Sequence, residues 1–351
     1  MIDSKDEKRW DGIVKSFPDW DVYYLCAYAR AFMLHGDGEP LLFLYEEDGI
    51  RFCDVVMKRD VAGMAAFQGL LEPGTYYDLE TPYGYGGPLI SENVTGSIPA
   101  DLQNRYKEQM GEYCREQKIV SEFVRFHPFL GNHDVLSQVI ESRYMRDTIF
   151  IDTSDEERIM QNMDSKNRNM VRKAIKSGVT VVQKPITEYN DFMYMYEKTM
   201  QRDHADPYFY FEDAYYKANE ELAENAMIFY AIYDEKPISG AIMYFNERNM
   251  HYHLSGSLAE YRNLAPSNLL LYEAAKWAAE HGIQRFHLGG GMAPDDSLFR
   301  FKKQFNKNGK LPFWVGRIIF DKKAYEELLH IRKAANSEFD VNNNRMIQYT
   351  Y

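Results

Sequence analysis

The sequence has 351 residues and a formal net charge of −12, with 45% hydrophobic and 27% charged residues. This length favours two domains, and this composition is that of a folded globular protein. The acidic balance argues against DNA or other nucleic acid binding across the whole surface, and no stretch approaches the roughly 20 apolar residues of a membrane span.

The first residues and the cysteines of the sequence indicate the cellular compartment of the protein. The stretch MIDSKDEKRWDG is charged, and no apolar run of signal-peptide length follows it. Cys26, Cys53 and Cys114 form no CxxC pair and are expected to be small buried hydrophobic residues. We therefore expect a cytoplasmic protein, with the inner face of the membrane as the alternative location.

The first half of the chain predicts helices mixed with strands. A helix over DVYYLCAYARAFMLHG ends at Gly36, and the strands PLLFLYEE and IRFCDVVMKR flank the hairpin turn Asp48-Gly49. There follow a strand that runs into the loop TPYGYGGPLI, a helix over 100–117, the strand IVSEFVRFHP and a short helix near 132–140. The strand RDTIFID then leads into a helix where Ser154 and Glu157 fit a capping box, and we place the domain boundary near 150.

The second half has the same mixed character. It predicts helices at 164–177, 188–203 and 211–223, followed by the strands AMIFYAIYD, PISGAIMYF and NMHYHLSGS. The next helix, about 267–281, is apolar around most of its circumference, so we expect it between two layers. The strand IQRFHL, a short helix, the strand FWVGRIIF and a helix over about 322–336 complete an α+β fold with helices on a mixed sheet.

The short helix in HLGGGMAPDDSLFRFKKQF places a lysine among phenylalanines. At about 100° per residue, Leu298, Phe301 and Phe305 share one arc, and Lys302 falls inside it. The other cations of this segment lie on the far side: Arg300, Lys303 and Lys307. An inward lysine needs an anion or must lose its proton. Lys302 therefore either covers Phe305 and pairs with a structural carboxylate, or meets a phosphate or a developing oxyanion in a cleft.

Two further features surround this helix. The segments 165–187 and 297–320 contain basic residues and no acid, which indicates either a local anionic ligand or two solvated helix faces. The glycines at 289–291 follow a strand, where ligands often bind α/β sheets, although a plain turn explains them as well. Asp296 and Ser297 are N-cap positions.

Three segments together resemble the Fem family of peptidoglycan-bridge aminoacyltransferases and the related GNAT acetyltransferase-like domains: SKNRNMVRKAIKSGVTV, LLLYEAAKWAAEHGIQRFHLGGG and DSLFRFKKQF. The match covers most of 151–320, and the first half fits through its length and TPYGYGGPL. The resemblance implies two GNAT-like domains, each a mixed, mostly antiparallel sheet flanked by helices. These are an N-terminal domain at 1–150, on which the C-terminal helix at 320–351 packs back, and an acyltransferase domain at 151–319.

The resemblance also implies an N-acyltransferase, which passes an acyl or aminoacyl group to an amine of a cell-envelope precursor such as a nucleotide-linked or lipid-linked sugar or a muropeptide. The Phe-Lys pair of the Fem acyl-transfer site matches Phe301 and Lys302. The arginine that contacts sugar-nucleotide phosphates looks like Arg202, and the aromatic strand that faces the acceptor looks like MHYHLSGS, with Tyr252. By position, we add to the substrate-binding candidates Arg168, Arg172, Tyr83, Tyr85, Gly289 and Gly290.

The donor is open at this point. GNAT enzymes hold the CoA pyrophosphate with a Q/R-x-x-G-x-G/A turn before a helix, and the matching RNLAPS keeps Arg262 but has Ala265 and Pro266. Arg262, Ser267 and Asn268 are the donor-binding candidates. We expect acyl-CoA or aminoacyl-tRNA as co-substrate and no tightly bound cofactor. The altered turn also motivates an alternative, a non-catalytic GNAT-like module that binds a sugar nucleotide or envelope precursor.

Histidines in the second half form a candidate metal set. His251 and His253 alternate along a strand, so they share one face, and His287 and Asp295 follow nearby in the sequence. Because nothing in the spacing brings these side chains within ligand distance, we assign no metal site.

Overall fold

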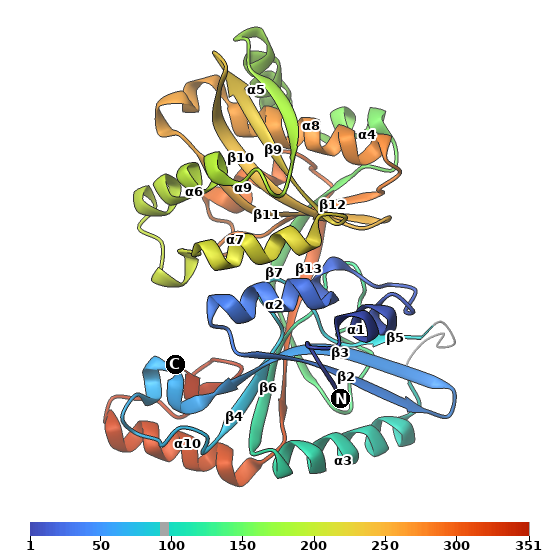
Figure 1. Ribbon diagram of the computed structural model, residues 1–351, viewed down its shortest axis with the longest axis vertical. Helices are drawn as coiled ribbons and strands as arrows, with labels where there is room; N and C mark the ends of the chain where they lie inside the picture. The colour runs from blue at the N-terminus through green and yellow to red at the C-terminus, as the bar shows by residue number, and fades with distance from the viewer. Residues whose placement is uncertain (92–97, 351) are drawn as a thin grey trace. The chain divides into compact units, whose positions relative to one another are not determined.

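The structure is a computed structural model that describes residues 1–91 and 98–350. The chain divides into two compact units: unit 1 contains Met1–Met145 and Phe313–Tyr351, and unit 2 contains Arg146–Pro312. Each unit is a mostly antiparallel sheet flanked by helices (Figure 1), which confirms the predicted α+β fold class. No helix in the described ranges combines the length and the apolar character that a membrane crossing requires.

Unit 1 is built on the strands β1 (Ile2–Asp3), β2 (Glu39–Glu47), β3 (Ile50–Asp60), β4 (Tyr77–Glu80), β5 (Leu89–Ile90), β6 (Ile119–Arg125) and β13 (Lys310–Ile319). Their order is β1-β2-β3-β4-β6-β13, with β5 beside β3. β4 and β6 are parallel, and the other pairs are antiparallel. The helices are α1 (Glu7–Val14), α2 (Cys26–His35), α3 (Ala100–Glu116) and α10 (Lys322–Ala335).

Unit 2 is built on the strands β7 (Glu141–Asp152), β8 (Thr180–Pro185), β9 (Ala226–Tyr233), β10 (Lys236–Phe245), β11 (Asn249–Ser257) and β12 (Arg285–Gly289). Their order is β7-β12-β11-β10-β9-β8, and only β11 and β12 are parallel. The helices are α4 (Glu156–Asn162), α5 (Ser165–Lys176), α6 (Asn190–Arg202), α7 (Asp213–Asn219), α8 (Pro266–Glu280) and α9 (Ser297–Lys303).

The two units repeat one pattern. In each, a long helix connects the parallel strands, α3 between β4 and β6 and α8 between β11 and β12, because parallel neighbours need a crossover connection. An antiparallel strand then completes each sheet next to the second parallel strand, β13 beside β6 and β7 beside β12. Each completing strand follows the other unit's parallel pair in the sequence.

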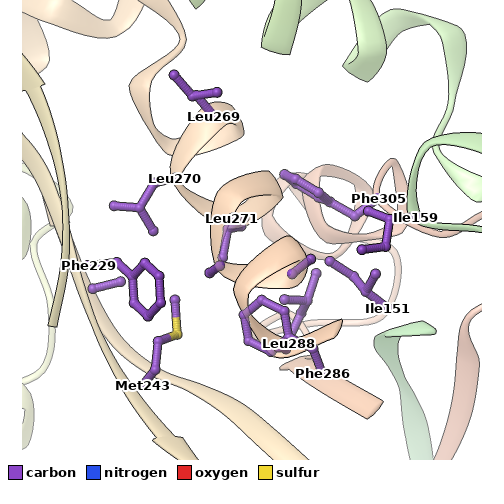
Figure 2. Close-up of a cluster of buried hydrophobic side chains, with 14 of the residues drawn as sticks. Ile151, Ile159, Phe229, Met243, Leu269, Leu270, Leu271, Phe286, Leu288 and Phe305 are labelled. Carbon is purple, nitrogen blue, oxygen red and sulfur yellow. The ribbon is translucent and has the colours of Figure 1, made fainter. Parts of the chain in front are cut away.

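The buried helix α8 organises the core of unit 2 (Figure 2). Leu270 and Leu271 pack toward Phe229 and Met243 of the sheet, and α4 and α5 contact α8 as well. Its apolar circumference is therefore covered on more than one side, as the sequence predicted. Small side chains along the helix allow this close packing: Ala274, Ala275 and Ala278, all with 0% exposure.

The opposite face of this sheet carries α6, and a glycine sets the distance between them. A Cβ atom on Gly256 would lie 2.4 Å from Tyr196 N and 2.7 Å from Met195 O, so the backbones of β11 and α6 are in contact. Thr199 Oγ1 fixes the pair because it accepts a 2.9 Å hydrogen bond from Ser257 N. This contact places the end of α6 beside the end of β11.

Two turns of unit 1 confirm sequence predictions. Asp48 and Gly49 have φ values of 53° and 75°, the two positive values that a tight hairpin with the observed β2–β3 pairing needs. α2 ends at Gly36, whose φ of 103° is the left-handed cap that glycine adopts without a steric penalty.

Other local predictions were wrong. The segment near 132–140 forms turns, because Asn132 Nδ2 donates to Gly86 O at 2.9 Å and Pro88 O at 3.3 Å and holds the chain in an irregular path. α4 is capped by Asp155, which accepts from Glu157 N at 3.0 Å, and not by Ser154. α1 and β8 also form where no element was predicted.

Candidate functional site

The sheet of unit 2 opens between its parallel strands. β11 and β12 pair only at Asn249–Arg285, Met250–Phe286 and His251–His287, although β11 continues to Ser257 and β12 to Gly289. On its other side β11 has a bulge, since the β10 register passes from Leu254 to Tyr252 and leaves His253 unmatched. Bulges bend a strand and are frequent beside active sites. The opening therefore starts at Tyr252 on β11.

Lys302 lies at this opening. Its side chain points inward with 8% exposure, as its position on the helix predicted. Nζ donates a 2.8 Å hydrogen bond to Gly290 O, directly after β12, and lies 5.8 Å from the centroid of the Tyr252 ring on β11. The ammonium group thus lies between Gly290 and Tyr252, and the structure brings together three residues that the sequence proposed: Lys302, Tyr252 and Gly290.

The charge of Lys302 has no ion-pair partner among residues 1–91 and 98–350. Burial lowers its pKa from 10.5 to about 8, while the more distant Asp296 carboxylate acts in the opposite direction. Asp296 itself caps α9 and accepts from Phe299 N at 2.7 Å and from Met292 N at 2.6 Å. The structural ion pair considered for Lys302 is therefore absent in that part of the chain, and the lysine remains a buried cation at neutral pH.

This pKa predicts how stability depends on pH. The unfolded chain holds the Lys302 proton up to about pH 10.5, whereas the folded chain releases it at about 8, so the free energy of unfolding rises with pH between these values. The full effect is on the order of 3 kcal/mol. Denaturant unfolding at pH 7 and pH 10 is expected to show wild type gaining stability relative to Lys302→Met, and a pH-independent difference would contradict the lowered pKa.

The glycines before α9 have separate structural reasons. Gly289 has a φ of 75°, a conformation that other residues rarely adopt. A Cβ atom on Gly291 would lie 2.1 Å from Asp296 Oδ1, so only glycine permits this approach. Gly290 contributes through its carbonyl, the acceptor for Lys302. The triplet is thus a turn that also positions the lysine.

The buried face of α9 is centred differently from the prediction. Phe299 is 6% exposed, whereas Leu298, assigned to the apolar arc, is 41% exposed. α9 begins only at Ser297, so Leu298 lies in its first turn and the face of Phe299 and Lys302 turns inward. Phe301 is half-buried and meets Phe305 edge-on at 5.4 Å.

A second group of polar side chains gathers at the N-terminus of α8. Ser267 Oγ lies 3.2 Å from Ser239 Oγ, and Asn268 Nδ2 donates to Asn167 Oδ1 at 2.6 Å. Sequence reasoning named Ser267 and Asn268 and missed the other two. In the sequence both look ordinary: Ser239 lies inside the apolar strand PISGAIMYF, and Asn167 lies in the first turn of α5, where the structure buries it fully. Arg262 precedes this group and is exposed.

Arg202 connects to the same end of the sheet. Its guanidinium donates to Ser257 O at 3.0 Å and to the Asp203 carboxylate at 2.8 and 3.2 Å. The neighbouring Gly256 O accepts from Ser239 Oγ at 3.2 Å. These contacts join Arg202 to the polar group at the α8 N-terminus.

The remaining basic and aromatic candidates have local partners. Arg168 donates to the carbonyls of Met160 and Met163 at the end of α4, and exposed Arg172 contacts Asn169 Oδ1 at 3.5 Å. The other two candidates belong to unit 1, where Tyr83 stacks on Phe32 at 5.5 Å and Tyr85 meets Tyr23 edge-on at 5.6 Å.

The histidines considered as metal ligands form hydrogen bonds. His253 Nε2 lies 2.6 Å from Tyr215 OH, and His287 Nε2 lies 2.9 Å from Thr148 Oγ1. Burial, and next the charge of His251, lower the pKa of His253 to about 3, so its ring is neutral at physiological pH. Asp295 is exposed.

Comparisons with known proteins bear on the fold of the chain. Residues 165–303 match the family model of the acetyltransferase (GNAT) domain. Among solved structures, FemX is 15% identical and aligns over 92% of this chain and 98% of its own, with a TM-score of 0.67. The C-terminal domain of a candidate lysylphosphatidylglycerol synthetase from Agrobacterium fabrum is 13% identical, with 95% of each chain covered and a TM-score of 0.55. L-PGS from Bacillus licheniformis is 13% identical, with 93% and 96% covered and a TM-score of 0.55.

No curated protein matches the sequence significantly. The structural likenesses, all at low identity, establish the fold, and the domain match covers most of unit 2. The chain therefore has a Fem-type, GNAT-like fold, and residues 165–303 match the acetyltransferase (GNAT) domain.

Proposed function

We propose that unit 2 transfers an acyl or aminoacyl group to an amine of a cell-envelope precursor, a nucleotide-linked or lipid-linked sugar or a muropeptide. The observation that carries this proposal is the buried ammonium group of Lys302 at the opening between β11 and β12, which has no ion-pair partner in the described ranges. A cation held in low-dielectric surroundings stabilises negative charge that develops beside it far better than it would in water.

In this reaction the amine nitrogen attacks the carbonyl carbon of the activated acyl group. Negative charge builds on the carbonyl oxygen, where Lys302 donates a hydrogen bond, and Phe301 and Tyr252 form apolar walls beside it. Collapse forms the amide and breaks the C–S bond of a thioester or the C–O bond of an aminoacyl ester. The amine proton passes to a carboxylate or phosphate of the substrate, since we assign no protein group as the base.

We assign acceptor binding to cationic and aromatic side chains. Arginine guanidinium groups bind phosphate by paired hydrogen bonds, which suits Arg202 with Arg168 or Arg172. In this proposal Arg202 exchanges its contact with Asp203 for the acceptor phosphate. The other acceptor residues proposed in unit 2 are Tyr252, Gly289 and Gly290, and Tyr83 and Tyr85 of unit 1 stay predictions from the sequence.

Donor binding is assigned to the N-terminus of α8, with Arg262, Ser267 and Asn268. A helix N-terminus attracts phosphate through its free N–H groups and dipole. Here Pro266 offers no N–H, and Asn268 N bonds to Ala265 O at 3.2 Å, so few backbone donors remain for a pyrophosphate. This weakens the usual CoA mode. The small number of free backbone donors supports two other possibilities. Either aminoacyl-tRNA is the donor, or the protein is a module that binds a sugar nucleotide and catalyses no reaction.

Thermal unfolding with separate ligands tests these assignments. Acetyl-CoA, an aminoacyl-tRNA and a UDP-sugar are added singly to the full chain, and the donor that binds raises the melting temperature. A positive donor is then mixed with amine acceptors, and amide formation is followed by mass spectrometry. If only the UDP-sugar stabilises the protein and no donor is consumed, the acyltransferase proposal is refuted and the non-catalytic binding module is supported.

A further inference from the structure

Unit 1 contains a pocket that the proposed acyl transfer does not use. Its cavity of about 170 Å³ lies between β2, β3 and α3 and has aromatic walls. The rings of Tyr45 and Phe52 stack at 5.8 Å, and Tyr106 meets them edge-on at 5.2 and 5.6 Å. Tyr113 adds a further ring and meets Phe43 at 5.8 Å. Clustered aromatic faces of this kind attract organic cations.

One carboxylate interrupts this aromatic wall. Asp54 pairs in register with Phe43 and lies two residues from Phe52 on β3, so its side chain shares the face that α3 covers. Asp54 is 8% exposed and lines the cavity. Its Oδ1 has no hydrogen-bond partner in the described ranges. An unpaired carboxylate in apolar surroundings is costly, and a donor in the pocket would relieve that cost.

A second buried carboxylate, Glu122, lies close enough to Asp54 to interact with it electrostatically. Glu122 on β6 is 2% exposed, and its Oε1 also has no hydrogen-bond partner among the described residues. Burial raises the pKa of Asp54 to about 7, and burial together with the charge of Asp54 raises that of Glu122 well above its usual value. Asp54 is the carboxylate that lines the cavity, so it is the one that a bound cation would meet.

We propose that this pocket binds a small primary organic ammonium ion, with its apolar body among the rings and its N–H groups donating to Asp54. A neutral apolar ligand would leave Oδ1 without a donor, and a quaternary ammonium has no N–H to offer. The cavity exceeds the roughly 30 Å³ share of one water several times over, which admits an organic body. The site lies within unit 1 and is independent of the acyl-transfer proposal.

Calorimetric titration of the full chain with three probes of similar size tests the ligand class. n-Butylammonium is expected to bind saturably. n-Pentanol, which brings no positive charge to Asp54, and tetramethylammonium, which has no N–H to donate, are each expected to bind at least about tenfold more weakly. Absence of saturable butylammonium binding at about 10 mM, or equal binding of n-pentanol, would overturn the proposal.

Two substitutions locate the binding. Asp54→Asn keeps the size of the side chain and removes its charge, and it is expected to weaken butylammonium binding about tenfold or more. Glu112→Gln removes an equal charge from an exposed position of α3 and should bind as wild type does. Phe52→Leu, which removes one ring, should weaken binding several-fold and serves if Asp54→Asn does not fold. Unchanged affinity in a folded Asp54→Asn or Phe52→Leu chain would refute the site.

Discussion

Lys302→Met is expected to lower the turnover number of acyl transfer by about 10²–10³, the usual loss when one oxyanion donor is removed. Methionine keeps the length and most of the volume of the side chain but cannot donate from the position beside Gly290 O. The measurement is single-turnover amide formation with the donor that stabilises the protein. Because the interaction is made with the developing oxyanion, the rate constant should fall more than substrate affinity.

The same variant is expected to be at least as stable as wild type at pH 7. The lysine is a buried cation without an ion-pair partner in the described part of the chain, so its removal relieves a desolvation cost. A loss of activity with a gain of stability would mark Lys302 as a residue kept for function. The matched control is Lys303→Met, which removes the neighbouring, partly exposed charge and should retain activity. Near-normal turnover of folded Lys302→Met would refute the catalytic assignment.

Leu271→Ala is expected to destabilise unit 2 by about 2–5 kcal/mol. Leu271 is fully buried on α8 against the cluster that includes Phe229 and Met243 (Figure 2), and truncation leaves a cavity that these neighbours cannot fill. Because the chain has two units, it need not unfold in one step. Amide hydrogen exchange of α8 and β9 therefore serves to measure the loss of stability in unit 2 alone.

The matched control for this prediction is Leu298→Ala, which makes the same chemical change at a side chain that is 41% exposed. It is expected to change the free energy of unfolding by less than about 0.5 kcal/mol. Equal effects of the two substitutions would mean that α8 is not the centre of the unit 2 core.

Much of the secondary structure could be predicted because its signals are local. Periodicity placed α8, and the Asp48-Gly49 turn with its flanking alternation placed β2 and β3. Predictions failed where distant contacts decide the local structure. Asn132 bonds to Gly86 and Pro88, far away in the sequence, and this contact produces turns where a helix was predicted.

The residues of the candidate site also fall into those that could be predicted from the sequence and those that could not. The angle of Lys302 on a short helix follows from backbone geometry, so its inward direction was readable. Ser239 and Asn167 were not, because each looks unremarkable in its own element and gains meaning only beside Ser267 and Asn268.

By itself, the sequence determined the α+β class, most helices and strands, and the inward cation at residue 302, since short-range periodicity and sterics control these features. Only the tertiary structure decided that β11 and β12 separate after three paired residues and that no carboxylate of the described chain neutralises Lys302. It also decided that Asp54 lies in an aromatic pocket. Strand pairing and burial depend on residues far apart along the chain, and no local pattern records which of them meet.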